Sequence, residues 1–78
     1  LRLIIKVLRS VENMKFAERL RQERIANGYN QTYIAKYMNV SQVSVSNWER
    51  GLKEPGFQAL IDLAQLFRRS TDYMLGVE

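Results

Sequence analysis

Hydrophobic residues recur at intervals of three or four along most of this chain, which is the pattern of amphipathic helices packed around a shared core. The sequence predicts five short helices in this way, over residues 15–27, 31–38, 42–50, 57–67 and 72–75. No strand-hairpin signal, internal repeat or low-complexity run separates them. We therefore expect an all-α fold, a compact five-helix bundle formed by residues 14–78.

The connections between these helices carry recognisable start and stop signals. Residues suited to cap the start of a helix, by accepting a backbone N–H of its first turn, are Asn30, Ser41 and either Ser70 or Thr71. Gly28 can adopt the left-handed conformation that ends the first helix, and Asn39 tolerates that conformation in the turn before the third. These signals place the helix boundaries.

Each predicted helix contributes apolar positions to the expected core. Those at helical spacing are Phe16, Ala17, Leu20, Ile25, Ile34, Ala35, Met38, Val45, Trp48, Phe57, Leu60, Leu63, Ala64, Phe67, Tyr73, Met74 and Leu75. Arg24 falls on the inward stripe of the first helix, where an unpaired charge would be costly. Arg24 therefore needs an acidic partner.

Residues 1–13 precede the bundle pattern and form an N-terminal amphipathic extension. On a helical wheel one broad arc holds Leu1, Leu3, Ile4, Ile5, Val7, Leu8 and Val11. The odd positions also fit one face of a strand, but the pattern favours a helix. Lys6 and Arg9 interrupt the apolar run, so neither a secretory signal nor a membrane span is expected. The apolar face needs a cover, either the bundle itself or a second copy of the chain.

Composition restricts the available chemistry. The 78 residues include no cysteine and no histidine, which excludes thiol chemistry, disulfides and the usual transition-metal ligands. The acidic residues expected on solvent faces or at caps, without a partner for acid–base catalysis, are Glu18, Glu23, Glu54, Asp62 and Asp72. We expect neither an enzyme nor a cofactor. The net charge of +4 favours a polyanionic partner, and the lack of cysteine fits the reducing cytoplasm.

Residues 15–76 resemble the lambda-repressor-like helix-turn-helix family, which includes phage Cro and repressor DNA-binding domains. The matching residues are Arg24, Gly28, Gln31, Ile34, Ala35, Val40, Ser41, Val45, Ser46, Trp48, Glu49, Arg50, Gly51, Pro55, Leu60, Ala64, Phe67 and Leu75. The order and spacing of the residues from Gln31 to Gly51 make this a specific resemblance. The chain departs from the family at Arg68 and Arg69, which stand where a glycine and an apolar residue are usual.

The resemblance implies that residues 42–50 are a recognition helix and that Arg24 pairs with Glu49. It also implies that the base-contacting residues are Gln42, Val43, Ser46 and Asn47. Gln and Asn can bond the edge of adenine, and Val43 suits a thymine methyl group. The expected phosphate-contacting residues are Gln31, Thr32, Ser41, Ser44, Arg50 and Lys53. The first two lie at a helix N-terminus, where free N–H groups attract anions. Tyr33 and Tyr37 could flank the DNA backbone or cover the side of the bundle.

The predicted function is that of a sequence-specific DNA-binding transcriptional regulator, a repressor, acting on double-stranded DNA in the cytoplasm. An antitoxin with a toxin partner, a restriction–modification controller and a protein-interaction module without DNA are the alternatives. Residues 31–51 carry a net charge of only +1, so we expect binding to rely on a homodimer. The candidate dimer surfaces are residues 1–11 and the apolar region of Tyr73, Met74, Leu75 and Val77.

Overall fold

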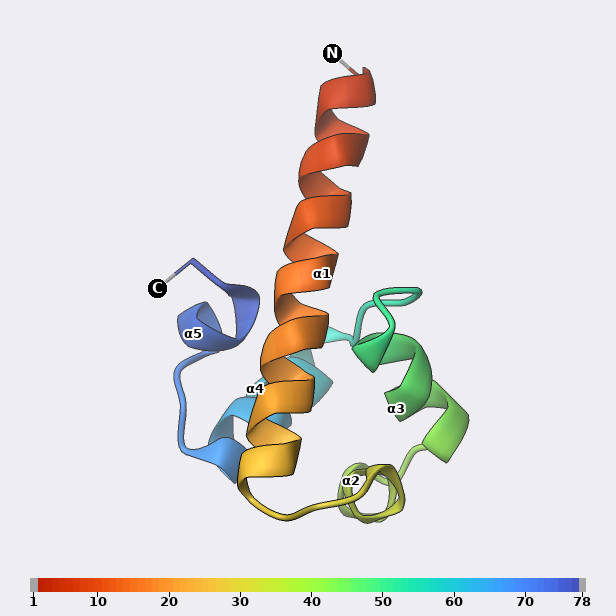
Figure 1. Cartoon of the computed structure of the whole chain (residues 1–78), viewed down its shortest axis with the longest axis vertical. Helices are drawn as coiled ribbons and strands as arrows, with labels where there is room; N and C mark the ends of the chain where they lie inside the picture. The colour runs from red at the N-terminus through yellow and green to blue at the C-terminus, as the bar shows by residue number, and fades with distance from the viewer. Residues whose placement is uncertain (1, 78) are drawn as a thin grey trace.

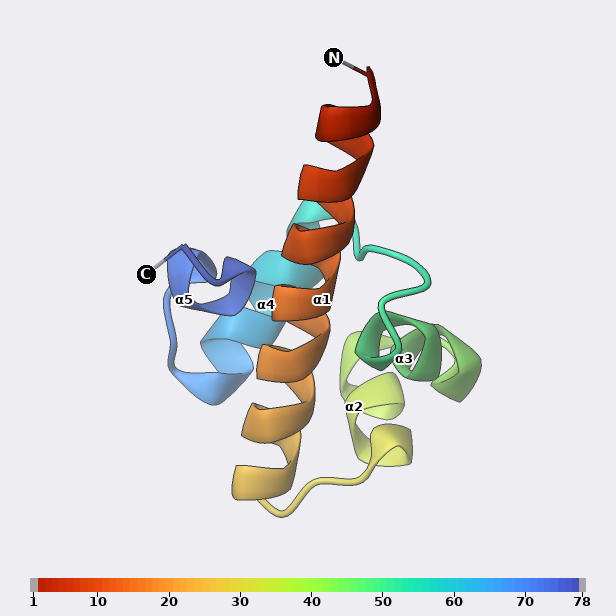
Figure 2. The same ribbon diagram turned by 45° about the horizontal axis from the view of Figure 1, so that its top comes forward.

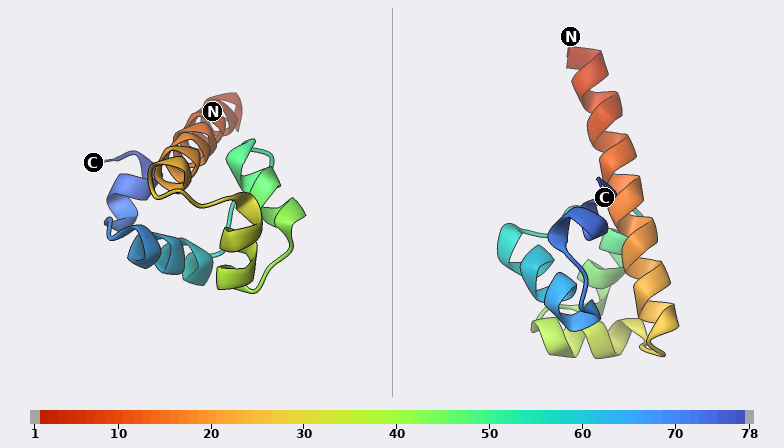
Figure 3. Two further views of the ribbon diagram at one scale, coloured as in Figure 1. Left: turned by 60° about the horizontal axis from the view of Figure 1, so that its bottom comes forward. Right: turned by 90° about the vertical axis from the view of Figure 1, so that its left-hand side faces the viewer.

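The computed structural model describes residues 2–77, with side chains from Met14 onward. It contains five helices: α1 (Arg2–Ala26), α2 (Gln31–Met38), α3 (Gln42–Glu49), α4 (Phe57–Phe67) and α5 (Thr71–Leu75). The C-terminal half of α1 packs against the rest of the bundle, and the other four helices lie along one side of it (Figures 1 and 2). The N-terminal half of α1 projects beyond them (Figure 3). The expected all-α, five-helix fold is confirmed.

Helix α1 is longer than expected. Residues 2–13 are helical, as predicted, and they continue without interruption into the helix that was predicted over residues 15–27. Neither glycine nor proline occurs between residues 1 and 27, so the sequence contains nothing that would interrupt the helix. The helix ends where Gly28 takes a φ of 73° and the N–H of Tyr29 bonds the carbonyl of Arg24 at 3.0 Å. The division into residues 1–13 and 14–78 stays a prediction.

The predicted caps of the shorter helices are confirmed. Asn30 accepts the N–H of Tyr33 at 2.8 Å, and Ser41 accepts the N–H of Ser44 at 3.1 Å. Ser70, rather than Thr71, caps α5 by accepting the N–H of Tyr73 at 3.0 Å. Asn39 is left-handed, with a φ of 56°. Helix α3 ends one residue early, because Arg50 is its C-cap.

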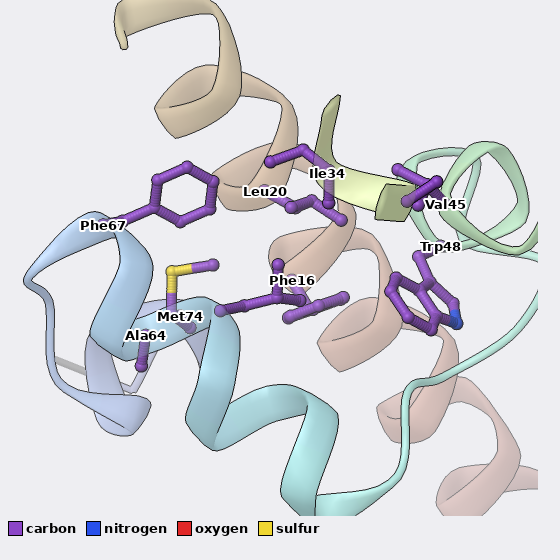
Figure 4. Close-up of a cluster of buried hydrophobic side chains, with 10 residues drawn as sticks. Phe16, Leu20, Ile34, Val45, Trp48, Ala64, Phe67 and Met74 are labelled. Carbon is purple, nitrogen blue, oxygen red and sulfur yellow. The ribbon is translucent and has the colours of Figure 1, made fainter. Parts of the chain in front are cut away.

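The core combines side chains from all five helices (Figure 4). Its buried members are Phe16, Leu20, Ile34, Ala35, Val45, Trp48, Leu63, Ala64, Phe67 and Met74. Three expected core residues are instead exposed to solvent: Phe57 is 89% exposed, Ile25 57% and Leu75 37%. Ile25 follows Phe16 by nine residues, about half a turn away around the helix. Phe57 is the first residue of α4, at the edge of the bundle.

Glu23 was expected on a solvent face, and this expectation is wrong. Glu23 lies seven residues after Phe16, on the inward stripe of α1, and only 7% of it is exposed. Its carboxylate accepts Arg69 Nε at 2.9 Å. The guanidinium groups of Arg69 and Arg19 lie 4.4 Å and 4.3 Å from the ring centroid of Tyr73 on α5. Arg69, one of the departures from the family pattern, therefore connects α5 to α1.

Arg68, the other departure, adopts a left-handed conformation with a φ of 55° at the end of α4. A residue with a Cβ atom is strained there, whereas glycine is not. We expect Arg68→Gly to raise the free energy of unfolding by about 0.5–1 kcal/mol. Urea denaturation would measure this change. Asn39→Gly is the control, and its effect should be smaller because asparagine tolerates this conformation. A destabilised Arg68→Gly variant would contradict the expectation.

Candidate nucleic-acid interface

Helix α3 packs on α2 and α1 with one face and presents the other outward (Figure 2). Val45 is fully buried and Trp48 is 7% exposed, so these two side chains fix the inner face. On the outer face Gln42 and Val43 are exposed, and Val43 is 63% exposed. Ser46 and Asn47 are half-buried beside them. The four predicted base-contacting residues therefore lie together on the outward side of α3.

The predicted Arg24–Glu49 ion pair is present and joins α1 to the end of α3. Arg24 Nε lies 2.7 Å from Glu49 Oε2, and a second guanidinium nitrogen lies 3.1 Å from Oε1. The third nitrogen donates to the carbonyl of Tyr29 at 2.9 Å. The side chains are 15% and 5% exposed respectively. This bidentate geometry satisfies both charges away from solvent and holds α3 against α1.

Gln31 links this ion pair to the outward face of α3. Its amide nitrogen donates to Glu49 Oε1 at 3.3 Å, and its amide oxygen accepts the amide nitrogen of Gln42. A carboxylate can only accept, so Gln31 must present its N–H to Glu49 and its oxygen to Gln42. Gln42 is thereby oriented, with its own oxygen and its second N–H available to a ligand. This bridging arrangement was not foreseen from the sequence, which suggested only a phosphate contact for Gln31.

The other predicted phosphate-contacting residues lie in two groups. Thr32 is exposed at the start of α2, and Ser41 and Ser44 lie at the start of α3, where their hydroxyl oxygens are 2.9 Å apart. Arg50 and Lys53 are exposed at the opposite end of α3. Arg50 there borders a hollow of about 430 Å³ beside α1. The two groups thus flank the base-contacting face, and their contacts with DNA stay a prediction.

Tyr33 partly covers the side of the bundle. Its ring stacks on Tyr29 with 4.3 Å between centroids, and Tyr29 in turn lies 6.4 Å from Phe67 in the core. The nearby phenol of Tyr29 raises the pKa of Tyr33 above its ordinary value of 10.0. Tyr33 is therefore neutral at physiological pH. Tyr37 is 51% exposed one turn further along α2.

Neither a metal site nor a membrane-spanning helix is found among the residues that the structure describes. No group of three or more acidic side chains there is placed to hold a metal ion. No helix there combines the length and apolarity needed to cross a bilayer.

The helix-turn-helix family pattern matches residues 20–74 of the chain. This protein belongs to that family. It is 36% identical over 63 residues to the transcriptional regulator ImmR of Bacillus subtilis, covering 81% of this chain and 50% of ImmR. It is 36% identical over 58 residues to repressor protein C2 of Salmonella phage P22, covering 74% of this chain and 27% of C2. This chain thus spans half or less of the length of these two relatives.

Two solved structures share the fold. The P22 c2 repressor, crystallised with a synthetic operator, is 33% identical with a TM-score of 0.75, over 81% of this chain and 96% of that one. The restriction–modification controller C.AhdI of Aeromonas hydrophila is 25% identical with a TM-score of 0.73, over 82% and 97%. These similarities confirm the lambda-repressor-like fold expected from the sequence.

Proposed function

We propose that this chain is a sequence-specific DNA-binding transcriptional regulator, a repressor, that reads the major groove with α3. The observation that carries the proposal is the outward face of α3, on which Gln42 is held by Gln31 and the buried ion pair. Helix-turn-helix proteins place the start of such a helix against base edges. The names of the relatives, regulators and a phage repressor, support the same assignment.

The orientation of Gln42 suits an adenine. Its free oxygen can accept the adenine N6 amino group while its remaining N–H donates to N7. Val43, exposed beside it, would contact a thymine methyl group, and Ser46 and Asn47 would complete the base contacts. Helix α3 would therefore prefer A·T pairs at the positions facing Gln42 and Val43.

The phosphate contacts would come from both ends of the face. The first N–H groups of α2, at Gln31 and Thr32, have no partner within the helix and can bind an anion. Ser41, Ser44, Arg50 and Lys53 supply further donors around α3. A homodimer would place two such faces on half-sites about one helical turn apart. The protein would act in the bacterial cytoplasm.

A restriction–modification controller is the second candidate, and it is favoured by the similarity to C.AhdI. Both candidates require binding to duplex DNA. Fluorescence anisotropy with random and operator-enriched duplexes, at low and high salt, tests that requirement. Binding should be visible at low salt and weaken as salt rises. The absence of binding at low salt would instead indicate a protein-interaction module.

Lys53→Gln tests the phosphate contacts. We expect this variant to bind all duplexes more weakly, because it loses one neutralised phosphate, and to reduce the salt slope of log K by about 1. Base preference should not change, since a phosphate contact carries no sequence information. Anisotropy titrations at several salt concentrations would measure the slope. Lys15→Gln, an exposed lysine on α1, is the matched control and should leave the slope unchanged.

A further inference from the structure

An apolar stripe lies along one face of the N-terminal half of α1 and continues into the bundle. Met14 and Ile25 are 68% and 57% exposed, and they share a face of α1 because eleven residues make about three helical turns. The helical repeat places five apolar residues of the N-terminal half on that same face, namely Leu3, Ile4, Val7, Leu8 and Val11. We call this face, from Leu3 to Met14, the apolar stripe of α1.

The apolar stripe lies on the opposite side of α1 from the core. Phe16 follows Val7 by nine residues, and Leu20 follows Val11 by nine, which is two and a half turns in each case. Phe16 and Leu20 are buried in the bundle, which lies along one side of α1 (Figure 3). The N-terminal residues that share a face with Leu20 are instead basic: Arg2, Lys6 and Arg9. The bundle of the same chain therefore does not cover the stripe, which leaves a second copy of the chain.

The stripe has the spacing by which two α-helices pair, with apolar residues three and four positions apart. Its four central positions are Ile4, Val7, Val11 and Met14. The same series continues to Glu18 and Arg21, which are both exposed. In a parallel pair each of these charges would face the identical charge of the other copy, and like charges repel. An antiparallel pair that overlaps only along the stripe leaves both charges outside the contact.

The position of α3 favours the antiparallel arrangement as well. Helix α3 lies to one side of α1 (right in Figure 1) and is joined to it by the Arg24–Glu49 ion pair. The two-fold axis of an antiparallel pair runs across the two helices and keeps both α3 helices on the same side, whereas the axis of a parallel pair runs along them and places the α3 helices on opposite sides. Two α3 helices on one side can meet the same duplex.

The length of the overlap sets the separation of the two bundles. If Ile4 of one copy is level with Met14 of the other, the two-fold axis passes level with residue 9. Leu20 lies eleven residues from that axis in each copy, so the two Leu20 positions are about 33 Å apart along α1. This is close to the spacing of about 34 Å between half-sites one helical turn of DNA apart.

The hollow of about 430 Å³ beside α1 lies where the partner's first turn would end. Its lining residues come from α1 and the end of α3: Met14, Lys15, Ala17, Glu18, Glu49 and Arg50. In the antiparallel register the first turn of the partner's α1 is level with Met14 and Ala17. The hollow therefore leaves room for the end of the partner's helix beside α3.

We propose that two copies of the chain pair in antiparallel fashion through the apolar stripe of α1, with Ile4 of each copy level with Met14 of the other and Val7 level with Val11. The pairing rests on the sequence and course of α1. Its consequence, that two α3 helices meet one duplex from the same side, rests on the proposed function and deepens it by naming the surface that joins the two copies.

Cross-linking of mixed variants is the principal test, and the chain suits it because it has no cysteine of its own. Ile4→Cys and Met14→Cys, one of them isotope-labelled, are mixed in equal amounts and treated with a short reagent that joins two thiols. The expected product is a covalent dimer with one chain of each kind, identified by its mass. Each variant alone should give little product, because identical residues are about 15 Å apart along the helix in the antiparallel register.

Lys6→Cys mixed with Asn13→Cys is the matched control. These two positions have nearly the same register along α1, but they lie on the face that continues toward Leu20. Their mixture should give only the background yield. Val7→Gln, introduced into both cysteine chains, should raise the protein concentration needed for half-maximal cross-linking at least about 10-fold. Glutamine favours helix, so α1 should persist. Lys6→Gln, the same new residue one position earlier, should leave that concentration unchanged.

Three results would overturn the antiparallel pairing. They are a yield from the Ile4→Cys and Met14→Cys mixture no higher than that of the control mixture, an equal yield from Ile4→Cys alone, which indicates a parallel pair, and an equal effect of Lys6→Gln and Val7→Gln. The outcome for the proposed function is separate. If the mixture cross-links but the chain binds no duplex DNA, the pairing stands and the proposed function fails. If the chain binds duplex DNA but the mixture does not cross-link on it, the pairing alone fails.

Discussion

Glu49→Ala is expected to lower the free energy of unfolding by about 3–5 kcal/mol. The substitution leaves the Arg24 guanidinium, 15% exposed, without its bidentate partner. It also removes the carboxylate that Gln31 bonds. Domains of this size rarely exceed about 3–5 kcal/mol of total stability, so the variant should be largely unfolded at 25 °C. Circular dichroism during urea and thermal denaturation would measure the loss.

Glu18→Ala is the matched control for this expectation. Glu18 belongs to α1 and is exposed, and within the described part of the chain its carboxylate accepts only a local hydrogen bond from Gln22 at 3.3 Å. Its removal should change stability by no more than about 0.5 kcal/mol. An unfolding midpoint for Glu49→Ala within error of the wild type would show that the ion pair does not hold α3 to α1.

Gln42→Ala is expected to abolish base preference at one position of the half-site while leaving the fold intact. A well-formed bidentate contact contributes about 1–3 kcal/mol of discrimination, so preference for adenine should fall by roughly 5- to 150-fold there. Gln42 is exposed, and among the residues that the structure describes its side chain bonds only Gln31, so stability should change little. Selection from a random duplex library, followed by anisotropy at fixed salt, would measure both preference and affinity.

Two further variants separate the base contact made by Gln42 from the orientation of its side chain by Gln31. Gln31→Ala leaves the Gln42 side chain in place but unbraced, so affinity should fall while the preferred base stays the same. Gln58→Ala, in the first turns of α4, removes an exposed glutamine that bonds Asp62 at 2.9 Å and should change neither property. A library selection that returns the same half-site from Gln42→Ala would show that Gln42 does not read bases.

Most of the predictable parts of this structure are set by neighbours in the sequence. Asn30 and Ser41 cap helices through residues three positions away, so their roles follow from local sequence. The Arg24–Glu49 pair spans 25 residues, and it could be predicted because both residues belong to the family pattern and because Arg24 falls on an inward stripe.

The parts that were missed depend on contacts between distant segments. Glu23 and Arg69 are 46 residues apart, and no local pattern links them. Two signals nevertheless pointed to them, since Glu23 falls on the stripe of Phe16 and Arg69 stands where an apolar residue is usual. Similarly, the phosphate contact of Gln31 was predicted from its position at the start of a helix. That position could not show that its side-chain amide lies between Glu49 and Gln42. Phe57 matched the helical spacing but lies at the edge of the bundle.

The unbroken course of α1 fixes a rotational phase between its two halves. An α-helix turns by about 100° and advances about 1.5 Å per residue, so one residue inserted between residue 13 and Phe16 would rotate residues 2–13 by that angle about the axis of α1. Seven inserted residues would complete nearly two turns and restore the original direction, about 10 Å further out. The packing of Phe16 and Leu20 in the core therefore also sets the rotational orientation of residues 2–13 about the axis of α1. A change in the number of residues between residue 13 and Phe16 would change that orientation.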